Sequence, residues 1–171
     1  LGLEGDAPRF TLAALWLDDD EDGDPDLYVV NDFGRNQLLR NEGGRFHDVA
    51  AELGVEDPAA GMGIDVADVD LDGRLDLYVT NMHSPIGLRV ARQERFLPTH
   101  PELRPEYVRQ ARGNTLLRAL SDGRFEDATE RAGVAAAGWG WGARFFDLQN
   151  DGLADLDAPN GFVSGPNRTD L

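Results

Sequence analysis

The stretch LDDDEDGDPDLYVV, from Leu17 to Val30, places a dense run of acids directly before an apolar segment typical of a β-strand. Six aspartates and one glutamate lie between Asp18 and Asp26. Two carboxylates about 4 Å apart repel each other by about 4 kcal/mol at an effective dielectric constant of about 20. The run is therefore either a solvated acidic turn or a site for a cation.

This acidic stretch is one of three copies in the chain. DDDEDGDPDLYVVN at Asp18 is followed by DVDLDGRLDLYVTN at Asp68 and by DLQNDGLADLDAPN at Asp147. Counted from the first aspartate, all three copies have an acid at position 5, glycine at 6, aspartate at 9 and leucine at 10. Between them, NQLLRNEGGRFHDVAAELGV (36–55) matches NTLLRALSDGRFEDATERAGV (114–134). The chain is thus a repeat protein, with blade repeats predicted to start near residues 11, 61 and 140.

Each repeat contains four short strand-like runs, and the first period, from Asp18 to Asp68, is 50 residues long. Four-stranded units of this length are typical of β-propeller blades, whereas a solenoid repeat, the alternative, usually carries one strand. We therefore predict an all-β fold in which residues 1–171 form a partial propeller of about two and a half four-stranded blades. Because such an arc leaves sheet edges open, we expect a fragment of a larger propeller.

An insertion from about 83 to 112 lengthens the second period to 79 residues, from Asp68 to Asp147. It contains six arginines, three glutamates and four prolines, which limit it to short helical pieces. One interpretation is a loop that contacts a partner, since insertions in repeat proteins often lie on the binding face. The favoured interpretation is a loop whose arginines pair with acids of the blades.

The three acidic loops have the spacing of an oxygen-ligand site for calcium. Ca²⁺ takes six to eight oxygens from carboxylates, carbonyls and water. Side chains at positions 1, 3 and 5, a carbonyl at 7 and a carboxylate at 9 can converge on one ion, with glycine at 6 allowing the bend. The predicted ligands are Asp18, Asp20, Asp22, the carbonyl of Asp24 and Asp26; Asp68, Asp70, Asp72, the carbonyl of Arg74 and Asp76; and Asp147, Gln149, Asp151, the carbonyl of Leu153 and Asp155.

Two to three Ca²⁺ sites are expected, because Gln149 gives the third loop a neutral oxygen in place of a carboxylate. The loops are not EF-hands, which need a glutamate at position 12, where this chain has Val29, Val79 and Ala158. Magnesium prefers a tighter octahedron, and zinc or copper prefer nitrogen or sulfur ligands.

Composition excludes several other classes of function. A formal net charge of −16 argues against nucleic acid and anionic membranes as partners, since both require basic patches. The absence of cysteine excludes disulfides and thiol chemistry, and no apolar run is long enough for a membrane helix. Ser84 follows His83 in sequence only, so no nucleophile and base pair is indicated and the protein is predicted not to be an enzyme.

The stretches DVDLDGRLDLYVTN, GRFEDATERAGV, GWGWGARFFDLQNDG and NGFVSGP together resemble the FG-GAP/VCBS repeats of integrin-type β-propellers. They are most similar to the propeller that precedes the ASPIC/UnbV domain in bacterial proteins and in the cartilage acidic protein family. This resemblance implies a seven-bladed propeller with calcium in the blade loops, located at the cell surface, in the periplasm or outside the cell.

The residues and the resemblance together predict a non-catalytic, calcium-binding scaffold or interaction module of an exported protein. Its expected partners are the remaining blades of the parent propeller and an unknown protein or glycan. The alternative is part of an enzyme or lectin acting on extracellular polysaccharide. Trp139 and Trp141 in GWGWG are expected to pack in the core and between blades, whereas a lectin predicts that one of them is exposed.

Overall fold

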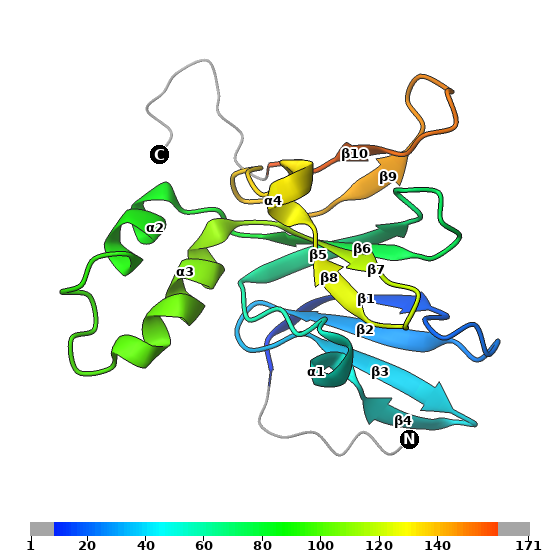
Figure 1. Ribbon diagram of the computed structural model, residues 1–171, viewed down its shortest axis with the longest axis horizontal. Helices are drawn as coiled ribbons and strands as arrows, with labels where there is room; N and C mark the ends of the chain where they lie inside the picture. Colours follow the sequence, from blue (N-terminus) through cyan, green and yellow to red (C-terminus); the bar gives the residue numbers. More distant parts are fainter. Residues whose placement is uncertain (1–8, 161–171) are drawn as a thin grey trace.

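The computed structural model describes residues 9–160, which form two four-stranded antiparallel sheets, a two-stranded hairpin and a helical insertion (Figure 1). The first blade contains β1 (Thr11–Leu17), β2 (Asp26–Asn31), β3 (Gln37–Glu42) and β4 (Arg45–Asp48) in chain order. The second blade contains β5 (Gly61–Ala67), β6 (Asp76–Asn81), β7 (Thr115–Ala119) and β8 (Phe125–Asp127) in the same order. The third hairpin pairs β9 (Arg144–Phe146) with β10 (Asp155–Asp157). The prediction of an all-β partial propeller is confirmed.

Both blades have the same strand register, as their repeated sequences require. Leu15 pairs with Tyr28 in the first blade, and Asp65 pairs with Tyr78 at the equivalent place in the second. The pair β1–β2 and the pair β5–β6 also share a register shift near the start of the first strand, at Thr11/Ala13 and at Gly61/Gly63. A repeated sequence has therefore produced a repeated backbone, including its irregularity.

The sheets stack so that their inner strands β1, β5 and β9 lie side by side (Figure 1). Alternation along the strands directs one set of apolar side chains to each face. The first blade contributes Tyr28 and Val30 to the core between the first two blades, and the second blade contributes Leu77 and Val79. On its other face the second blade presents Tyr78 and Leu116, which pack against residues of the third hairpin.

Each blade also ends in a short helix that the sequence did not reveal. These helices are α1 (Ala50–Leu53) and α4 (Thr129–Ala132), and each is closed by a glycine in the left-handed conformation, Gly54 or Gly133. The turn brings a backbone carbonyl to the core tyrosine: Tyr28 Oη donates to Val55 O at 2.7 Å, and Tyr78 Oη donates to Val134 O at 2.8 Å. One buried hydrogen bond thus fixes the same turn in both blades.

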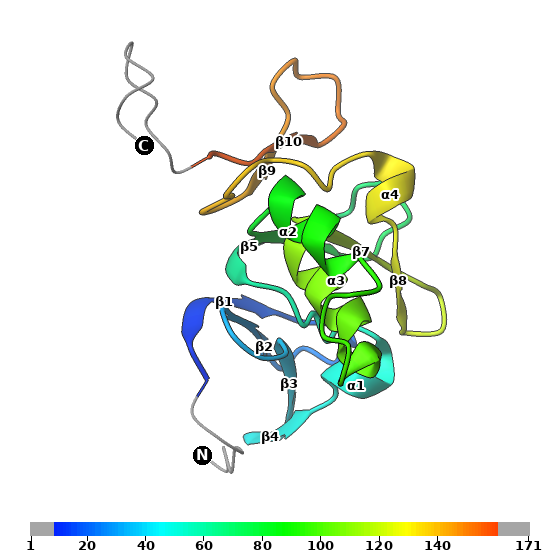
Figure 2. The same ribbon diagram turned by 90° about the vertical axis from the view of Figure 1, so that its left-hand side faces the viewer.

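The insertion folds into helices, as predicted. It contains α2 (Pro85–Ala91), the 3₁₀ turn η1 (Pro101–Leu103) and α3 (Arg104–Arg112). α2 and α3 pack together at the end of the blades opposite the acidic loops (Figures 1 and 2). Within residues 9–160, none of the helices has the length and apolar character needed to cross a membrane.

Two arginines of α3 attach the insertion to the blades. Arg109 lies 2.5 Å from the buried carboxylate of Asp57, which also accepts from Thr115 Oγ1 at 2.7 Å and from Asn81 Nδ2 at 3.0 Å. Arg112 pairs with Asp127 at 2.5 Å. The interpretation in which insertion arginines pair with blade acids is thus confirmed for these two residues.

Candidate metal sites in the acidic loops

Each acidic loop connects two paired inner strands of a blade or hairpin, and the three loops lie at the same end of the stack (Figure 1). Their backbones share an uncommon conformation. At position 4 a residue other than glycine has positive φ: 60° at Glu21, 58° at Leu71 and 58° at Asn150. At position 6 the glycine has φ of 84° to 90°, where a side chain would be strained. The three loops therefore have one geometry, which the glycine permits.

The first aspartate of each loop folds over the turn and accepts hydrogen bonds from its backbone. Asp18, Asp68 and Asp147 each accept the amide of the position-6 glycine, at 3.0, 2.8 and 2.7 Å. The acid at position 5 accepts the amide of position 7 in the same way, at 2.8 Å for Asp22 and 2.9 Å for Asp151. These bonds hold the carboxylates in place without using all of their lone pairs.

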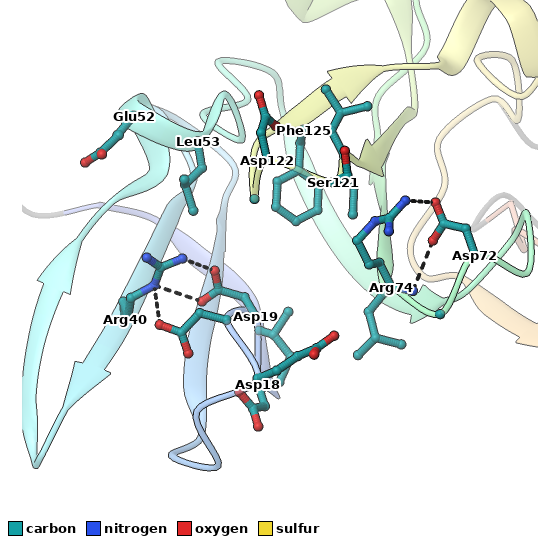
Figure 3. A pocket seen from close by; sticks show the side chains of 18 residues that line it. Asp18, Asp19, Arg40, Glu52, Leu53, Asp72, Arg74, Ser121, Asp122 and Phe125 are labelled. Atoms are coloured by element: carbon teal, nitrogen blue, oxygen red, sulfur yellow. Dashed lines mark hydrogen bonds and ion pairs between the residues drawn. The ribbon is translucent and has the colours of Figure 1, made fainter.

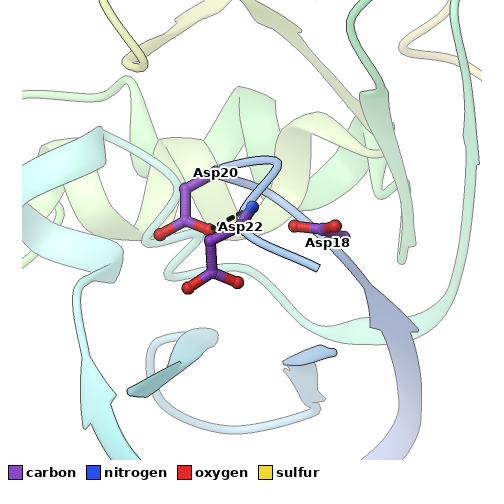
Figure 4. Close-up of side chains that lie close together, drawn as sticks. All are labelled: Asp18, Asp20 and Asp22. Carbon is purple, nitrogen blue, oxygen red and sulfur yellow. Dashed lines mark hydrogen bonds between the residues drawn. The ribbon is translucent and has the colours of Figure 1, made fainter. Parts of the chain in front are cut away.

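Two of the loops bring three carboxylates together. One oxygen from each of Asp18, Asp20 and Asp22 lies within 4.8 Å of the other two (Figure 4). The same holds for oxygens of Asp68, Asp70 and Asp76. Asp18 Oδ1 is moreover buried without a hydrogen-bond partner in the part of the chain that the structure describes. The third loop forms no such group among residues 9–160, since Gln149 takes the place of an acid.

The aspartate at position 9 has a structural task that sequence spacing alone did not reveal. Asp26 is fully buried, and its two oxygens accept the amides of Asp19 at 2.9 Å and Asn41 at 2.7 Å. Asp76 likewise accepts the amides of Val69 and Ala119. Burial raises the pKa of both carboxyls above the usual value for aspartate. Only Asp76 also joins its loop's group of acids, so Asp26 primarily ties the first loop to β3.

Two arginines that the sequence analysis missed reach into the loops. Arg40 follows the two leucines of β3, and it pairs with Asp19 at 2.5 Å and with Asp20 at 3.2 Å (Figure 3). Arg118, its equivalent in the second blade, pairs with Asp70 at 2.5 Å. The hydrogen bond from Arg118 holds the pKa of Asp70 below its usual value. The sequence does contain a signal for these two arginines, because each is the last residue of a repeated motif, NQLLR or NTLLR.

The first and second loops face each other across a cavity of about 810 Å³. Figure 3 shows acids on both sides, with Asp18 and Asp19 on the first loop and Asp72 on the second. The hairpin between β7 and β8 forms another wall and contributes Asp122. The end of the molecule that carries the loops is therefore strongly acidic.

The donor set in the loops fits calcium. Every candidate ligand is an oxygen, the carboxylates are preorganised by backbone amides, and one buried carboxylate oxygen of the first loop lacks a partner. Hard divalent cations take such ligands, whereas zinc and copper favour nitrogen or sulfur. At position 7 of each loop the predicted ligand is a backbone carbonyl. The three loops share one backbone conformation, so this carbonyl belongs to the same turn in each of them.

Ser84 and His83 have separate roles, both in positioning the insertion. Ser84 Oγ caps α2 by accepting the amide of Gly87 at 3.0 Å, and His83 Nδ1 lies 2.8 Å from the carbonyl of Arg112. GWGWG departs from its expected packing, because Trp141 is 53% exposed. The prediction that one tryptophan lies in the core and the other between blades is therefore not met by Trp141. Of NGFVSGP, residues 161–166 lie outside the described residues.

Residues 18–79, which contain the first two acidic loops, match the FG-GAP-like repeat family. A segment of 62 residues of this chain is similar to cartilage acidic protein 1. Identity is 40% over 62 residues with both the Mus musculus and the Homo sapiens proteins. The matched segment covers 35% of this chain but only 10% and 9% of those two proteins. The predicted family resemblance is confirmed.

Proposed function

We propose that this chain is a calcium-binding β-propeller segment that acts as a non-catalytic scaffold or interaction module of an exported or cell-surface protein. The observation that carries the proposal is the repetition of one loop geometry, with positive φ at position 4 and an inward-turned aspartate at position 1 in all three copies. In two copies this geometry gathers three carboxylates, and in the first it leaves the buried Asp18 Oδ1 without a partner among residues 9–160, which a solvated acidic turn does not require. Similarity to cartilage acidic protein 1 supports the location outside the cytoplasm.

Calcium in this proposal has a structural role. The ion offsets repulsion within Asp18, Asp20 and Asp22 and within Asp68, Asp70 and Asp76. Since the loops preorganise these acids only in the folded chain, binding stabilises the native state by mass action. At a free calcium concentration of 100 Kd the gain is about 2.7 kcal/mol per site. Arg40 pairs with Asp20 and Arg118 pairs with Asp70, the acids at position 3 of their loops. The two arginines therefore compete with the ion for these carboxylate oxygens.

The test is calcium titration by calorimetry, together with thermal melts in calcium and in excess chelator. The variant carries Asp20→Asn, Asp70→Asn and Asp151→Asn, and the matched control carries Glu42→Gln, Glu94→Gln and Glu130→Gln, which remove the same number of charges outside the loops. We expect calcium to bind and to raise the melting temperature in the wild type and the control but not in the variant. Absence of calcium-dependent heat in the wild type would remove calcium from the proposal.

The proposal includes one partner, a further blade of the same kind, which would cover the free face of the first blade. Leu12 and Trp16 on that face are 52% and 61% exposed. Of their equivalents in the second blade, Val66 packs against the core between the first two blades, and Met62 is only 7% exposed. A longer chain that adds a preceding blade should shift the fluorescence of Trp16 to shorter wavelength; unchanged emission from Trp16 would contradict this partner.

One observation favours a second candidate, a lectin. Exposure of Trp141 is what binding of a sugar ring by stacking requires. This candidate predicts that soluble polysaccharide quenches or shifts the emission of Trp141, and that Trp141→Ala abolishes the effect. Because exposure of a single side chain carries the lectin, whereas the acidic loops of all three copies carry the module, the module interpretation remains the conclusion.

A further inference from the structure

A groove of about 310 Å³ lies between the helical insertion and the blades, at the end of the molecule opposite the acidic loops (Figures 1 and 2). α2 and α3 form one side, and the segments that follow β2 and β6 form the other. Its main lining residues are Phe33, Met82, Val90, Phe96, Tyr107 and Gln110. The calcium proposal does not involve this groove, so the two can fail independently.

The lining is apolar and includes aromatic rings that remain open to solvent. Phe96 and Tyr107 meet edge to face with their centroids 5.3 Å apart, and Phe33 forms a similar pair with Phe10 at 5.8 Å. Phe33 is 58% exposed and Tyr107 is 43% exposed. Concave apolar sites of roughly 300–1,000 Å³ with a few polar groups are typical of small-molecule binding sites. The size of this groove suits a ligand of one or two rings.

Two polar side chains in the lining can donate hydrogen bonds to such a ligand. Ser84 Oγ accepts from the amide of Gly87, which leaves its own O–H free to donate. Gln110 is half-buried, and its side-chain amide has no hydrogen-bond partner within residues 9–160. Both groups therefore suit a ligand with an acceptor at one end.

The insertion that forms one side of the groove has an excess of positive charge, with six arginines and three glutamates between residues 83 and 112. Arg89, Arg92 and Arg95 of the insertion have no carboxylate partner in the described residues, and neither does Arg104. Arg104 lies beside the aromatic pair, because its Nε donates to the carbonyl of Phe96 at 2.7 Å. In a chain with a formal net charge of −16, the insertion is therefore a local region of net positive charge.

We propose that this groove binds a small amphipathic carboxylate, with its aromatic or branched apolar body against Phe96, Tyr107 and Val90. The carboxylate accepts from Gln110 and Ser84, and the arginines of the insertion, with Arg104 beside Phe96, supply the positive charge. A cationic ligand of the same shape is disfavoured by those arginines and finds no acidic side chain among the groove's lining residues. A neutral ligand gains the apolar contacts but lacks the attraction of the positive field.

The experiment compares three probes of one shape on the 171-residue chain: 1-naphthoate, 1-naphthamide and 1-naphthalenemethylamine. Binding is followed by chemical-shift changes in amide-resolved NMR spectra, at fixed ionic strength. For a ligand of this size we expect naphthoate to have a Kd on the order of 1 mM. The shifts should saturate and concentrate on residues of α2, α3 and the segment around Phe33. The amide should bind less tightly, and the amine at least about tenfold less tightly.

Two variants locate the site. Val90→Asp places a charge in the groove and should weaken naphthoate binding by at least about tenfold. Ile86→Asp adds the same charge to an exposed position of α2 that does not line the groove, and should leave affinity nearly unchanged. Circular dichroism confirms that both variants fold. The proposal is overturned if naphthoate gives no saturable shifts at the groove, if the amine binds as tightly as naphthoate, or if the two variants weaken binding equally.

Discussion

The two complete blades have the same backbone but different neighbours, and this separates what a repeat dictates for itself from what its surroundings decide. Strand register, the acidic loop, the helical turn and the tyrosine hydrogen bond occur in both blades. The covered faces differ: both faces of the second blade are packed, whereas one face of the first blade exposes Leu12 and Trp16. Local geometry thus follows from the repeat alone, while burial requires a neighbouring blade.

The insertion adds a second difference between the blades. Asp57, which follows the turn of the first blade, has Ala136 as its equivalent after the second. The buried Asp57 carboxylate is where Arg109 of the insertion attaches. Within residues 9–160, the junction that the insertion covers carries an ion pair with both partners largely buried, whereas at the next junction Asp65 pairs with an exposed arginine, Arg144.

A large effect on the free energy of unfolding is expected from breaking this ion pair. Arg109→Met leaves Asp57 with two neutral donors, Thr115 and Asn81, but without a counter-charge. Loss of one partner of a buried pair costs about 3–5 kcal/mol, and the remaining donors place this case near about 3 kcal/mol. Urea unfolding measures the change in the free energy of unfolding.

Arg89→Met is the matched control, because Arg89 lies on the same insertion and has no ion pair within residues 9–160. It should change the free energy of unfolding by no more than about 0.5 kcal/mol. Equal effects of the two substitutions would show that Arg109 does not anchor the insertion. In the double variant Asp57→Ala with Arg109→Met, part of the loss should be recovered, since no buried charge remains unpaired.

The next comparison concerns equivalent leucines on the covered and the free face. Leu77 of the second blade is fully buried in the core between the blades, whereas its equivalent Leu27 is only half-buried. Leu77→Ala should cost about 2–5 kcal/mol in the free energy of unfolding. Leu27→Ala should cost about 1 kcal/mol, because less apolar surface leaves a buried environment. Similar losses in urea unfolding would mean that the face of the first blade is already covered in solution.

Sequence repetition was enough to predict the elements that recur. The three acidic loops and the strands around them could be predicted because the same pattern recurs in each copy. The short helices α1 and α4 could not, since each spans only four residues and has no side-chain cap hydrogen bond. They depend on contacts made after folding, such as the hydrogen bond from Tyr28 to Val55.

Features that occur once, or that depend on distant residues, were also beyond the sequence. Nothing adjacent to Asp57 indicates that Arg109 will reach it, because 52 positions separate them and the pair has no second copy. Arg40 and Arg118 do recur, yet their pairing with the loops depends on how β3 and β7 lie beside the acidic turn. Trp141 was predicted to be buried because alternation in a strand indicates a face but not whether that face is covered.

Substituting the core tyrosines should show where the two blades behave alike. Tyr28 and Tyr78 each donate to a turn carbonyl and accept from an asparagine, Asn36 at 3.3 Å and Asn114 at 2.7 Å. Tyr28→Phe and Tyr78→Phe each leave these buried groups without a partner, which costs about 1–3 kcal/mol. Urea unfolding of the two variants should give losses within about 1 kcal/mol of each other. A loss in only one blade would show that the turn is held differently in the two repeats.

The smallest expected effect compares the third loop with the second, and it depends on the calcium proposal. The third loop has the same backbone as the others, but Gln149 stands where Asp70 stands in the second. If position 3 ligates calcium, Gln149→Asp adds a charged oxygen and should raise the affinity of the third loop about tenfold, equivalent to about 1.4 kcal/mol. Asp70→Gln should weaken the second loop, although by less than the loss of a free carboxylate, because Arg118 already binds Asp70. The amide signals of Gly152 and Gly73 report the two loops separately in NMR titrations with calcium. If calcium shifts both glycines and neither substitution changes its affinity, then position 3 is not a ligand, and the acids at positions 1 and 5 hold the ion.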